Sequence, residues 1–113
     1  MSEMKTTEVT AEELSRWIGE GNPNFRLVDV REQDEYEICR LPGSELIPLS
    51  NFADLAPGKL GEKSETIVVY CHHGMRSQRA ANWLRQQGYE DVINLTGGID
   101  AWSETVDASV PRY

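Results

Sequence analysis

The sequence contains few cysteines, no long apolar run and a shortage of positive charge, and each deficit excludes a class of protein. Two cysteines among 113 residues cannot build the disulfide framework of a small secreted domain. The longest unbroken apolar run covers residues 67–71, whereas a helix needs about 20 apolar residues to cross a bilayer. A net charge of −8 at pH 7 argues against nucleic acid and against anionic membrane surfaces as partners.

The beginning of the chain carries no recognisable targeting signal. Residues 1–5 are mostly polar and no apolar stretch follows them, so we expect no secretory signal peptide. The predicted location is therefore cytoplasmic, a reducing compartment in which Cys39 and Cys71 stay free thiols. A chain of 113 residues fits one domain, which we predict to span residues 1–113.

Predicted strands alternate with predicted helices along the chain, which is typical of a parallel sheet in an α/β domain. A capping box at Thr10 and Glu13 begins the first helix, and Gly21 with the turn at residues 22–24 ends it. The other predicted helices cover residues 31–38, 76–87 and 99–103, with a weak helical turn at 51–55 and a loop at 57–64, and the predicted strands cover residues 25–30, 46–49, 66–70 and 91–95.

Chemically interesting residues follow three of the predicted strands. Asp29 and Arg31 lie at the end of the first strand, Cys71 follows the most apolar strand, and Gly97 and Gly98 follow the last one. Sites in open parallel sheets form at the carboxyl ends of the strands. We therefore expect these three segments to meet at one edge of the sheet.

Cys71 is the expected centre of the site. The segment after it contains Gly74 and leads into a helix, so backbone N–H groups can surround an anion there. A thiol in this position should ionise more readily than a free cysteine, whose pKa is about 8.5, and the thiolate is the nucleophile. Residues 66–89 contain arginines but no acidic residue, and Arg76 is expected beside the sulfur. The hypothesis requires main-chain donors around this sulfur in place of aliphatic side chains.

A series of short motifs runs along nearly the whole chain: DVRE at 29–32, EY at 35–36, LPGS at 41–44, IPL at 47–49, VYC at 69–71 with Gly74, Arg76 and Ser77, LTGGI at 95–99 and AW at 101–102. Together these motifs resemble the rhodanese (sulfurtransferase) domain. The resemblance implies a three-layer α/β fold with a central parallel sheet of about five strands and helices on both faces. The tail, residues 102–113, is similar to the rhodanese domain that ends molybdopterin-synthase sulfurylases, the adenylyltransferases that charge ubiquitin-like sulfur carriers.

The resemblance also implies a reaction, thiosulfate sulfurtransfer, with no cofactor and no metal. Thiolate Cys71 takes a sulfane sulfur from thiosulfate or a protein persulfide, and a thiol protein or a ubiquitin-like sulfur carrier then accepts it in ping-pong kinetics. Arg76 holds the anionic donor and stabilises the thiolate or persulfide. The other implied site residues are the loop residues His72, His73, Gly74, Met75 and Ser77 and the supporting residues Asp29, Arg31, Gly97 and Gly98.

Four of these residues have structural interpretations as well. Asp29 and Arg31 could be catalytic, but we favour hydrogen bonds that fix the loop after the strand, with a pair to Glu35. For Gly97 and Gly98 we predict a tight turn that lets the backbone approach the cysteine loop.

The two histidines and the second cysteine also have simple interpretations. Adjacent side chains point apart and zinc needs about four ligands, so we expect His72 and His73 to radiate outward and shape the rim of the loop. A role as a base is a minor alternative. Cys39 is interpreted as a small buried hydrophobe, with a second sulfur-accepting thiol as the alternative.

Two other functions are alternatives to sulfur transfer. The cysteine phosphatase pattern is Cys-x5-Arg, whereas four residues lie between Cys71 and Arg76, so the loop is too short to wrap a tetrahedral phosphate. The second alternative is a low-turnover sulfur relay or a binding module that serves a ubiquitin-like sulfur carrier. The acidic remainder of such a module could dock a basic partner.

Overall fold

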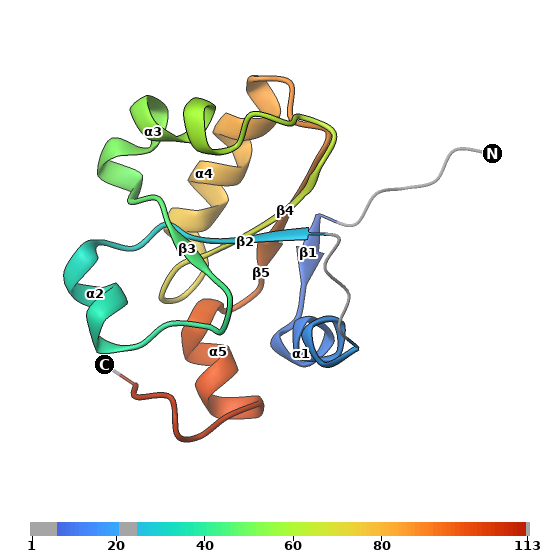
Figure 1. The fold of residues 1–113 in the computed structure, drawn as a ribbon. Helices are drawn as coiled ribbons and strands as arrows, with labels where there is room; N and C mark the ends of the chain where they lie inside the picture. Colours follow the sequence, from blue (N-terminus) through green and yellow to red (C-terminus); the bar gives the residue numbers. More distant parts are fainter. Residues whose placement is uncertain (1–6, 21–24, 113) are drawn as a thin grey trace.

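A five-stranded parallel sheet forms the centre of the molecule, a computed structural model that describes residues 7–20 and 25–112 (Figure 1). The strand order is β1-β5-β4-β2-β3, and every pairing is parallel. The predicted end of the first helix at residues 21–24 lies outside the described residues. The strands are β1 (Glu8–Val9), β2 (Phe25–Asp29), β3 (Glu45–Leu46), β4 (Thr66–Tyr70) and β5 (Asp91–Leu95), and the helices are α1 (Ala11–Gly19), α2 (Gln33–Ile38), η1 (Leu49–Asn51), α3 (Phe52–Lys59), α4 (Met75–Gln86) and α5 (Gly98–Thr105).

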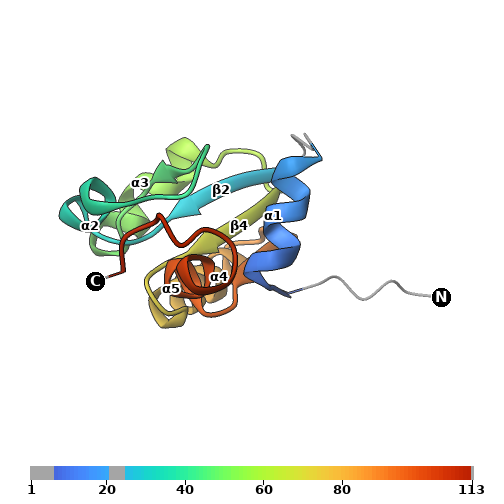
Figure 2. The same ribbon diagram turned by 90° about the horizontal axis from the view of Figure 1, so that it is seen from below.

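Helices cover both faces of this sheet, with α3 and α4 on one face and α1 and α5 on the other (Figures 1 and 2). Strand β4 shows the consequence for the sequence. Ile67 and Val69 pack into the core under α3 and α4, whereas Val68 and Tyr70 pack into the core under α1 and α5. A strand buried on both faces has to be apolar throughout, which is why this segment reads as an unbroken apolar run. The predicted three-layer α/β fold is confirmed.

The first helix begins where the sequence predicts. The Thr10 hydroxyl accepts the Glu13 backbone N–H at 3.1 Å, and the Glu13 carboxylate accepts the Thr10 backbone N–H at 3.0 Å. These two bonds satisfy donors that an uncapped helix end would leave unpaired. Leu14 is fully buried on the inner face of this helix, against the sheet.

The structure corrects the prediction around residue 57, where a helix replaces the expected loop. Helix α3 continues to Lys59 although Pro57 lies inside it. Proline removes one backbone N–H from a helix and usually interrupts it. Here Phe52, Ala56 and Leu60 recur every four residues and are all buried in the core, so tertiary packing outweighs the local cost.

The edges of the sheet differ most from the prediction. The strand expected at 46–49 is β3, which ends at Leu46, just before Pro48 and the short helix η1. Strand β1 was not predicted, because two residues are too few to show a hydrophobic period. In the part of the chain that the structure covers, no helix has the length and apolar character to cross a membrane.

Candidate active site

Cys71 directly follows β4 and begins the loop that leads into α4. Its Sγ accepts the backbone N–H of Gly74 at 3.0 Å and lies 3.5 Å from the Ser77 hydroxyl oxygen. Gly74 has a φ of +112°, in the left-handed region that side chains disfavour, and ends the turn that brings its N–H back to the sulfur. The sulfur therefore has the main-chain donor that the sequence-based hypothesis requires.

Cys71 is also almost completely buried, with 1% of its surface exposed. It belongs to the core cluster under α3 and α4, so apolar side chains surround part of the residue. This burial differs from the expectation that main-chain donors, and not aliphatic side chains, surround the sulfur. Its cause is the position of Cys71 at the end of the most buried strand. Because bulk water is largely excluded, the hydrogen bonds to this sulfur act in a less screened environment.

Asn94 of β5 connects the cysteine loop to the neighbouring strand. It is 4% exposed, and its Oδ1 accepts a hydrogen bond from the Ser77 hydroxyl. Its Nδ2 donates to the Gly74 carbonyl at 3.3 Å and to Gln78 Oε1 at 3.2 Å. The sequence analysis missed this residue. The available signal was a polar amide between the apolar residues Ile93 and Leu95 near the end of a strand.

Gly98 lets the start of α5 approach the backbone of the cysteine loop. The Ile99 N–H donates to the Cys71 carbonyl at 2.9 Å, and the Asp100 N–H donates to the His72 carbonyl at 3.0 Å. Gly98 has a φ of +62°, and a Cβ at this position would lie 2.5 Å from the Cys71 carbonyl oxygen. A side chain does not fit there, so the structure shows the close approach predicted for the Gly97–Gly98 turn.

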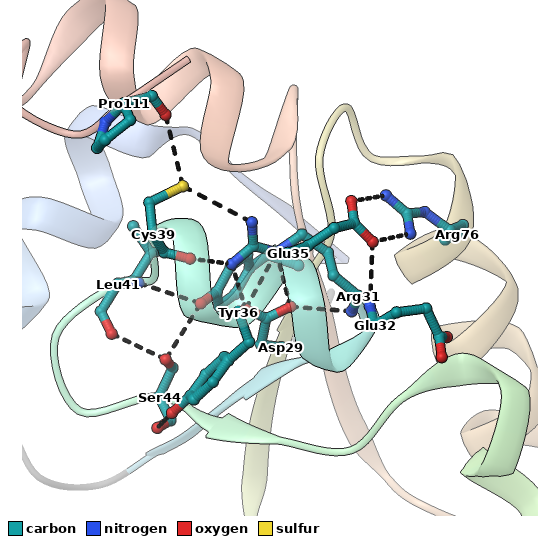
Figure 3. Close-up of polar contacts among 11 residues, drawn as sticks. Asp29, Arg31, Glu32, Glu35, Tyr36, Cys39, Leu41, Ser44, Arg76 and Pro111 are labelled. Atoms are coloured by element: carbon teal, nitrogen blue, oxygen red, sulfur yellow. Dashed lines mark hydrogen bonds and ion pairs between the residues drawn. The ribbon is translucent and has the colours of Figure 1, made fainter. Parts of the chain in front are cut away.

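Arg76 points away from the core and forms a two-pronged ion pair with Glu35 of α2 (Figure 3). Its Nη1 donates to Glu35 Oε1 at 2.6 Å and its Nη2 donates to Oε2 at 2.8 Å. The sequence predicted this guanidinium as the group that holds an anionic donor. The structure instead shows an acidic partner for it, contributed by a segment outside the acid-free stretch 66–89.

Asp29 and Arg31 form a buried ion pair beneath α2, and neither side chain is exposed to solvent (Figure 3). Arg31 Nη2 donates to Asp29 Oδ2 at 2.6 Å and also to the Cys39 carbonyl. The Asp29 carboxylate accepts the Arg31 backbone N–H at 2.9 Å as well. These contacts fix the chain between β2 and α2, which supports the structural interpretation. Glu35, with which the sequence predicts a pair for this segment, also forms the ion pair with Arg76.

His72 and His73 do not point apart, so that part of the prediction is wrong. Their rings lie 3.9 Å apart between centroids and are inclined by 32°, which places one imidazole against the other. The His73 side chain is 65% exposed, as expected of a rim residue, and its Nε2 lies 3.8 Å from Asp100 Oδ2. Burial, together with the neighbouring His73, lowers the pKa of His72 below the ordinary 6.5.

The two imidazoles and Asp100 form a group of side chains that could hold a metal ion. One ligand atom from each residue lies within 4.8 Å of the others. However, both oxygens of Asp100 already accept hydrogen bonds from Arg112, at 2.9 and 3.1 Å. A cation would have to displace this guanidinium, and the group offers fewer than the about four ligands that zinc prefers.

The other two residues singled out from the sequence lie at opposite extremes of exposure. Met75 begins α4 and is 76% exposed beside the cysteine loop. Cys39 is 8% exposed and packs in the core under α1 and α5, on the opposite face of the sheet from the cluster that contains Cys71. Its Sγ donates to the Pro111 carbonyl at 3.4 Å (Figure 3). These contacts fit a small buried residue that anchors the tail.

Comparisons with known proteins agree with this architecture. Residues 10–105 match the family described as Rhodanese-like domain. The thiosulfate sulfurtransferase GlpE of Pseudoalteromonas translucida is 37% identical over 86 residues, which are 76% of this chain and 80% of that protein. The chloroplastic Rhodanese-like/PpiC domain-containing protein 12 of Arabidopsis thaliana is 47% identical over 91 residues, and the match covers 78% of this chain but only 30% of that relative.

Similarity to the sulfurylases and to solved structures extends over most of the chain. The probable adenylyltransferase/sulfurtransferase MoeZ of Mycobacterium tuberculosis is 31% identical over 109 residues, 96% of this chain and 28% of that protein. The solution structure of the rhodanese-like domain of the Anabaena protein Alr3790 has a TM-score of 0.82 and 32% identity, covering 91% of this chain and 76% of that one. With the family match spanning residues 10–105, the chain belongs to the rhodanese-like domain family.

Proposed function

We propose that this chain is a sulfurtransferase that carries a sulfane sulfur on Cys71 from a donor to a thiophilic acceptor, as a single domain over residues 1–113. The observation that supports this most is the 3.0 Å contact between Cys71 Sγ and the Gly74 N–H, in a loop that opens helix α4. Backbone N–H groups at a helix N-terminus stabilise negative charge, and both a thiolate and a persulfide carry it. The similarity to a protein named thiosulfate sulfurtransferase supports the same class of reaction.

The first half-reaction transfers a neutral sulfur atom to Cys71. The Cys71 thiolate attacks the outer sulfur of the donor, a new S–S bond forms, and the S–S bond of the donor breaks. The electron pair of the broken bond leaves on sulfite when the donor is thiosulfate, or on a thiolate when it is a cysteine persulfide. The negative charge of the enzyme ends on the outer sulfur of the Cys71 persulfide.

The second half-reaction returns the enzyme to its starting state. A nucleophilic acceptor attacks the outer sulfur, and the electrons of the enzyme S–S bond return to Cys71 as the thiolate. The Gly74 N–H stabilises the sulfur in both states, and Gly98 keeps the loop rigid by packing against its carbonyls. Because each half-reaction releases a product before the next reactant binds, we expect ping-pong kinetics.

The site residues outside the loop backbone have supporting roles in this proposal. The stacked pair His72 and His73 and the exposed Met75 form the rim that a donor or acceptor meets. Asp29 and Arg31 hold the segment that carries Glu35.

Phosphatase activity is the weaker candidate. Four residues separate Cys71 from Arg76, and the guanidinium that would hold phosphate oxygens is engaged by Glu35 at 2.6 and 2.8 Å. We therefore expect no hydrolysis of aryl phosphates.

The names of several relatives point to a class of acceptor. They include adenylyltransferase/sulfurtransferases and a putative sulfur carrier protein of Bacillus subtilis, YrkF, which is 37% identical over 84 residues. We infer that the acceptor is a thiol protein or a ubiquitin-like sulfur carrier. The reaction needs a free thiol, so we place it in a reducing compartment such as the cytoplasm.

Transfer of sulfur from thiosulfate to cyanide, measured as thiocyanate, tests the proposal. Cys71→Ala should abolish transfer while the circular dichroism spectrum stays native. Cys39→Ala is the matched control and should retain transfer, because Cys39 lies in the other core cluster. Transfer that survives in Cys71→Ala would assign the chemistry to another residue.

A further inference from the structure

We infer that Glu35 determines the sulfur donor, by occupying Arg76 and thereby favouring a cysteine persulfide over thiosulfate; this inference rests on the proposed sulfur transfer at Cys71. Both terminal nitrogens of the Arg76 guanidinium donate to the Glu35 carboxylate, Nη1 to Oε1 at 2.6 Å and Nη2 to Oε2 at 2.8 Å. A sulfonate or sulfate group is held by arginine through this same pair of parallel N–H bonds. The pair of N–H groups that would hold the donor is therefore already bound to a carboxylate of the protein itself.

The Glu35 carboxylate is held in place by its own helix. Its Oε1 also accepts the backbone N–H of Glu32 at 3.0 Å, as part of the capping box that begins α2. The side chain is 16% exposed, so it is mostly withdrawn from solvent. Since it is both anchored and shielded, this carboxylate is a stronger competitor for the guanidinium than a mobile surface acid.

The ion pair lies within electrostatic reach of the cysteine loop. Glu35 raises the pKa of His72 and Arg76 lowers it, so the two charges oppose each other at the residue next to Cys71. A dianionic donor that approaches this loop meets a neutralised pair in place of a free cation. To use Arg76, thiosulfate has to displace Glu35 or bind beside a carboxylate that repels it.

Two further arginines near the loop are also engaged by acidic side chains. Arg112 binds Asp100 and Glu104, at 2.9 and 2.8 Å, on the side of the loop where Asp100 faces His73. Arg31 is buried with Asp29 and has no solvent exposure. Neither of these groups offers an exposed, unengaged positive charge to a dianion.

A cysteine persulfide does not need such a charge. It has no sulfonate to hold, and its outer sulfur only has to reach Cys71 Sγ, which the Gly74 N–H already contacts at 3.0 Å. In the transfer, Cys71–S⁻ and R–S–SH give Cys71–S–SH and R–S⁻, so one S–S bond is exchanged for another and no oxidant or reductant is consumed. The donor cysteine can belong to a protein or to a small thiol, and Met75, 76% exposed at the rim, offers apolar surface to a protein.

Donor selectivity in the full chain tests this inference. The donors are thiosulfate, the persulfide of N-acetylcysteine methyl ester, whose only charge is on the persulfide, and persulfidated serum albumin as the protein source. Glu35→Gln removes the charge and keeps the size. It should lower KM for thiosulfate by about tenfold with kcat within about twofold, because the freed guanidinium gains a charge-assisted contact. KM for the small persulfide should stay within about twofold, and added salt should raise KM for thiosulfate more steeply than in the wild type.

Glu37→Gln is the matched control, since it removes the same charge from the same helix, where Glu37 only accepts a bond from Gln33. It should leave KM for thiosulfate nearly unchanged. Arg76→Gln serves as a second variant if Glu35→Gln does not fold, and it should raise KM for thiosulfate and spare the persulfide. Comparison of the two persulfides shows whether the donor cysteine is on a protein or on a small thiol.

The inference is overturned if Glu35→Gln leaves KM for thiosulfate unchanged, if Glu37→Gln lowers it equally, or if the wild type prefers thiosulfate to both persulfides. These outcomes differ from a failure of the proposed function, in which neither donor class places sulfur on Cys71 of the wild type.

Discussion

The Cys71 sulfur combines near-complete burial with a direct hydrogen bond from the backbone. An exposed thiol would share its hydrogen bonds with water, whereas Cys71 is 1% exposed and meets the fixed Gly74 N–H at 3.0 Å. A fixed dipole in a poorly solvated site stabilises a charged sulfur without reorganising as the charge moves. The residues that set the position of this loop are therefore as important as the cysteine itself.

Gly98→Ala should lower the free energy of unfolding by about 2–4 kcal/mol, because the new Cβ would overlap the carbonyls of Cys71 and His72 and the φ is positive. Urea denaturation measures the change. The matched control is Gly58→Ala in α3, where a Cβ meets nothing within 4 Å. That change should be neutral or stabilise by up to about 1 kcal/mol. Equal effects of the two substitutions would contradict the packing described for Gly98.

His72 should make stability depend on pH between about pH 6.5 and the lower pKa of the folded state. Burial lowers the pKa of His72 from 6.5, so the unfolded chain binds a proton at a higher pH than the native state does. The contribution to stability is complete above pH 6.5 and is lost as pH falls through the folded pKa. Urea unfolding at pH 7.5 and pH 5.5 should show this loss in the wild type.

His72→Gln should flatten this part of the pH profile. His73→Gln should retain most of it, because burial of His72 is the main cause and His73 is a smaller one. A wild-type slope in the His72→Gln variant would assign the titration to another group.

Chain order explains which residues of the site could be predicted. Cys71, Gly74 and Arg76 lie within the short segment 71–76, so their proximity follows from the sequence. Gly98 can be predicted because it belongs to a glycine pair that follows a strand. Glu35 is 41 residues from Arg76 and is one of 19 acidic residues, so nothing local marks it as the partner. The burial of Cys71 likewise depends on helices that cover β4 and lie elsewhere in the sequence.

At the scale of elements, the start of α4 is held by β5. Asn94 reaches from the strand to the carbonyl of Gly74, whose N–H donates to the Cys71 sulfur, and accepts the hydroxyl proton of Ser77, which lies beside that sulfur. A helix begins with backbone N–H groups that lack partners within the helix, and this strand keeps those near the sulfur in position. The geometry of the loop is thus a property of the β4-α4-β5 unit.

Asn94→Ala should reduce the rate of sulfur transfer by about tenfold, because the loop loses the hydrogen bonds that hold Gly74 and Ser77 in position. It should also lower the free energy of unfolding by about 1–3 kcal/mol, because buried polar groups lose a hydrogen-bond partner. Thiocyanate formation and urea denaturation give the two values. Asn82→Ala on the exposed side of α4 is the matched control and should change neither. An Asn94→Ala variant with wild-type transfer would show that the loop keeps its geometry without β5.

The elements that sequence patterns missed are those that depend on tertiary contacts. The local signal of Pro57 predicts a loop, whereas the buried stripe of Phe52, Ala56 and Leu60 keeps the segment helical. Strand β1 has two residues and exists because Glu8 and Val9 pair with β5. The long elements β4 and α4 were predicted within one residue of their bounds, because their apolar periods are continuous.

At the scale of the whole molecule, the parallel topology gathers distant segments around one sulfur. The ends of β2, β4 and β5 and the beginnings of α2, α4 and α5 all contribute residues to the site. The same topology changes the electrostatics read from the sequence, because Glu35 of α2 meets the positive stretch that surrounds Cys71. One of the three arginines of that stretch is thereby neutralised by a residue from outside it.

The most direct test is the intact mass of the protein after incubation with thiosulfate or a small persulfide and removal of the donor. We expect one added sulfur, about 32 Da, in the wild type and in Cys39→Ser, and none in Cys71→Ser. Cyanide should remove the added mass. An unmodified wild-type protein, or sulfur that stays on Cys71→Ser, would contradict the role of Cys71 as the sulfur carrier.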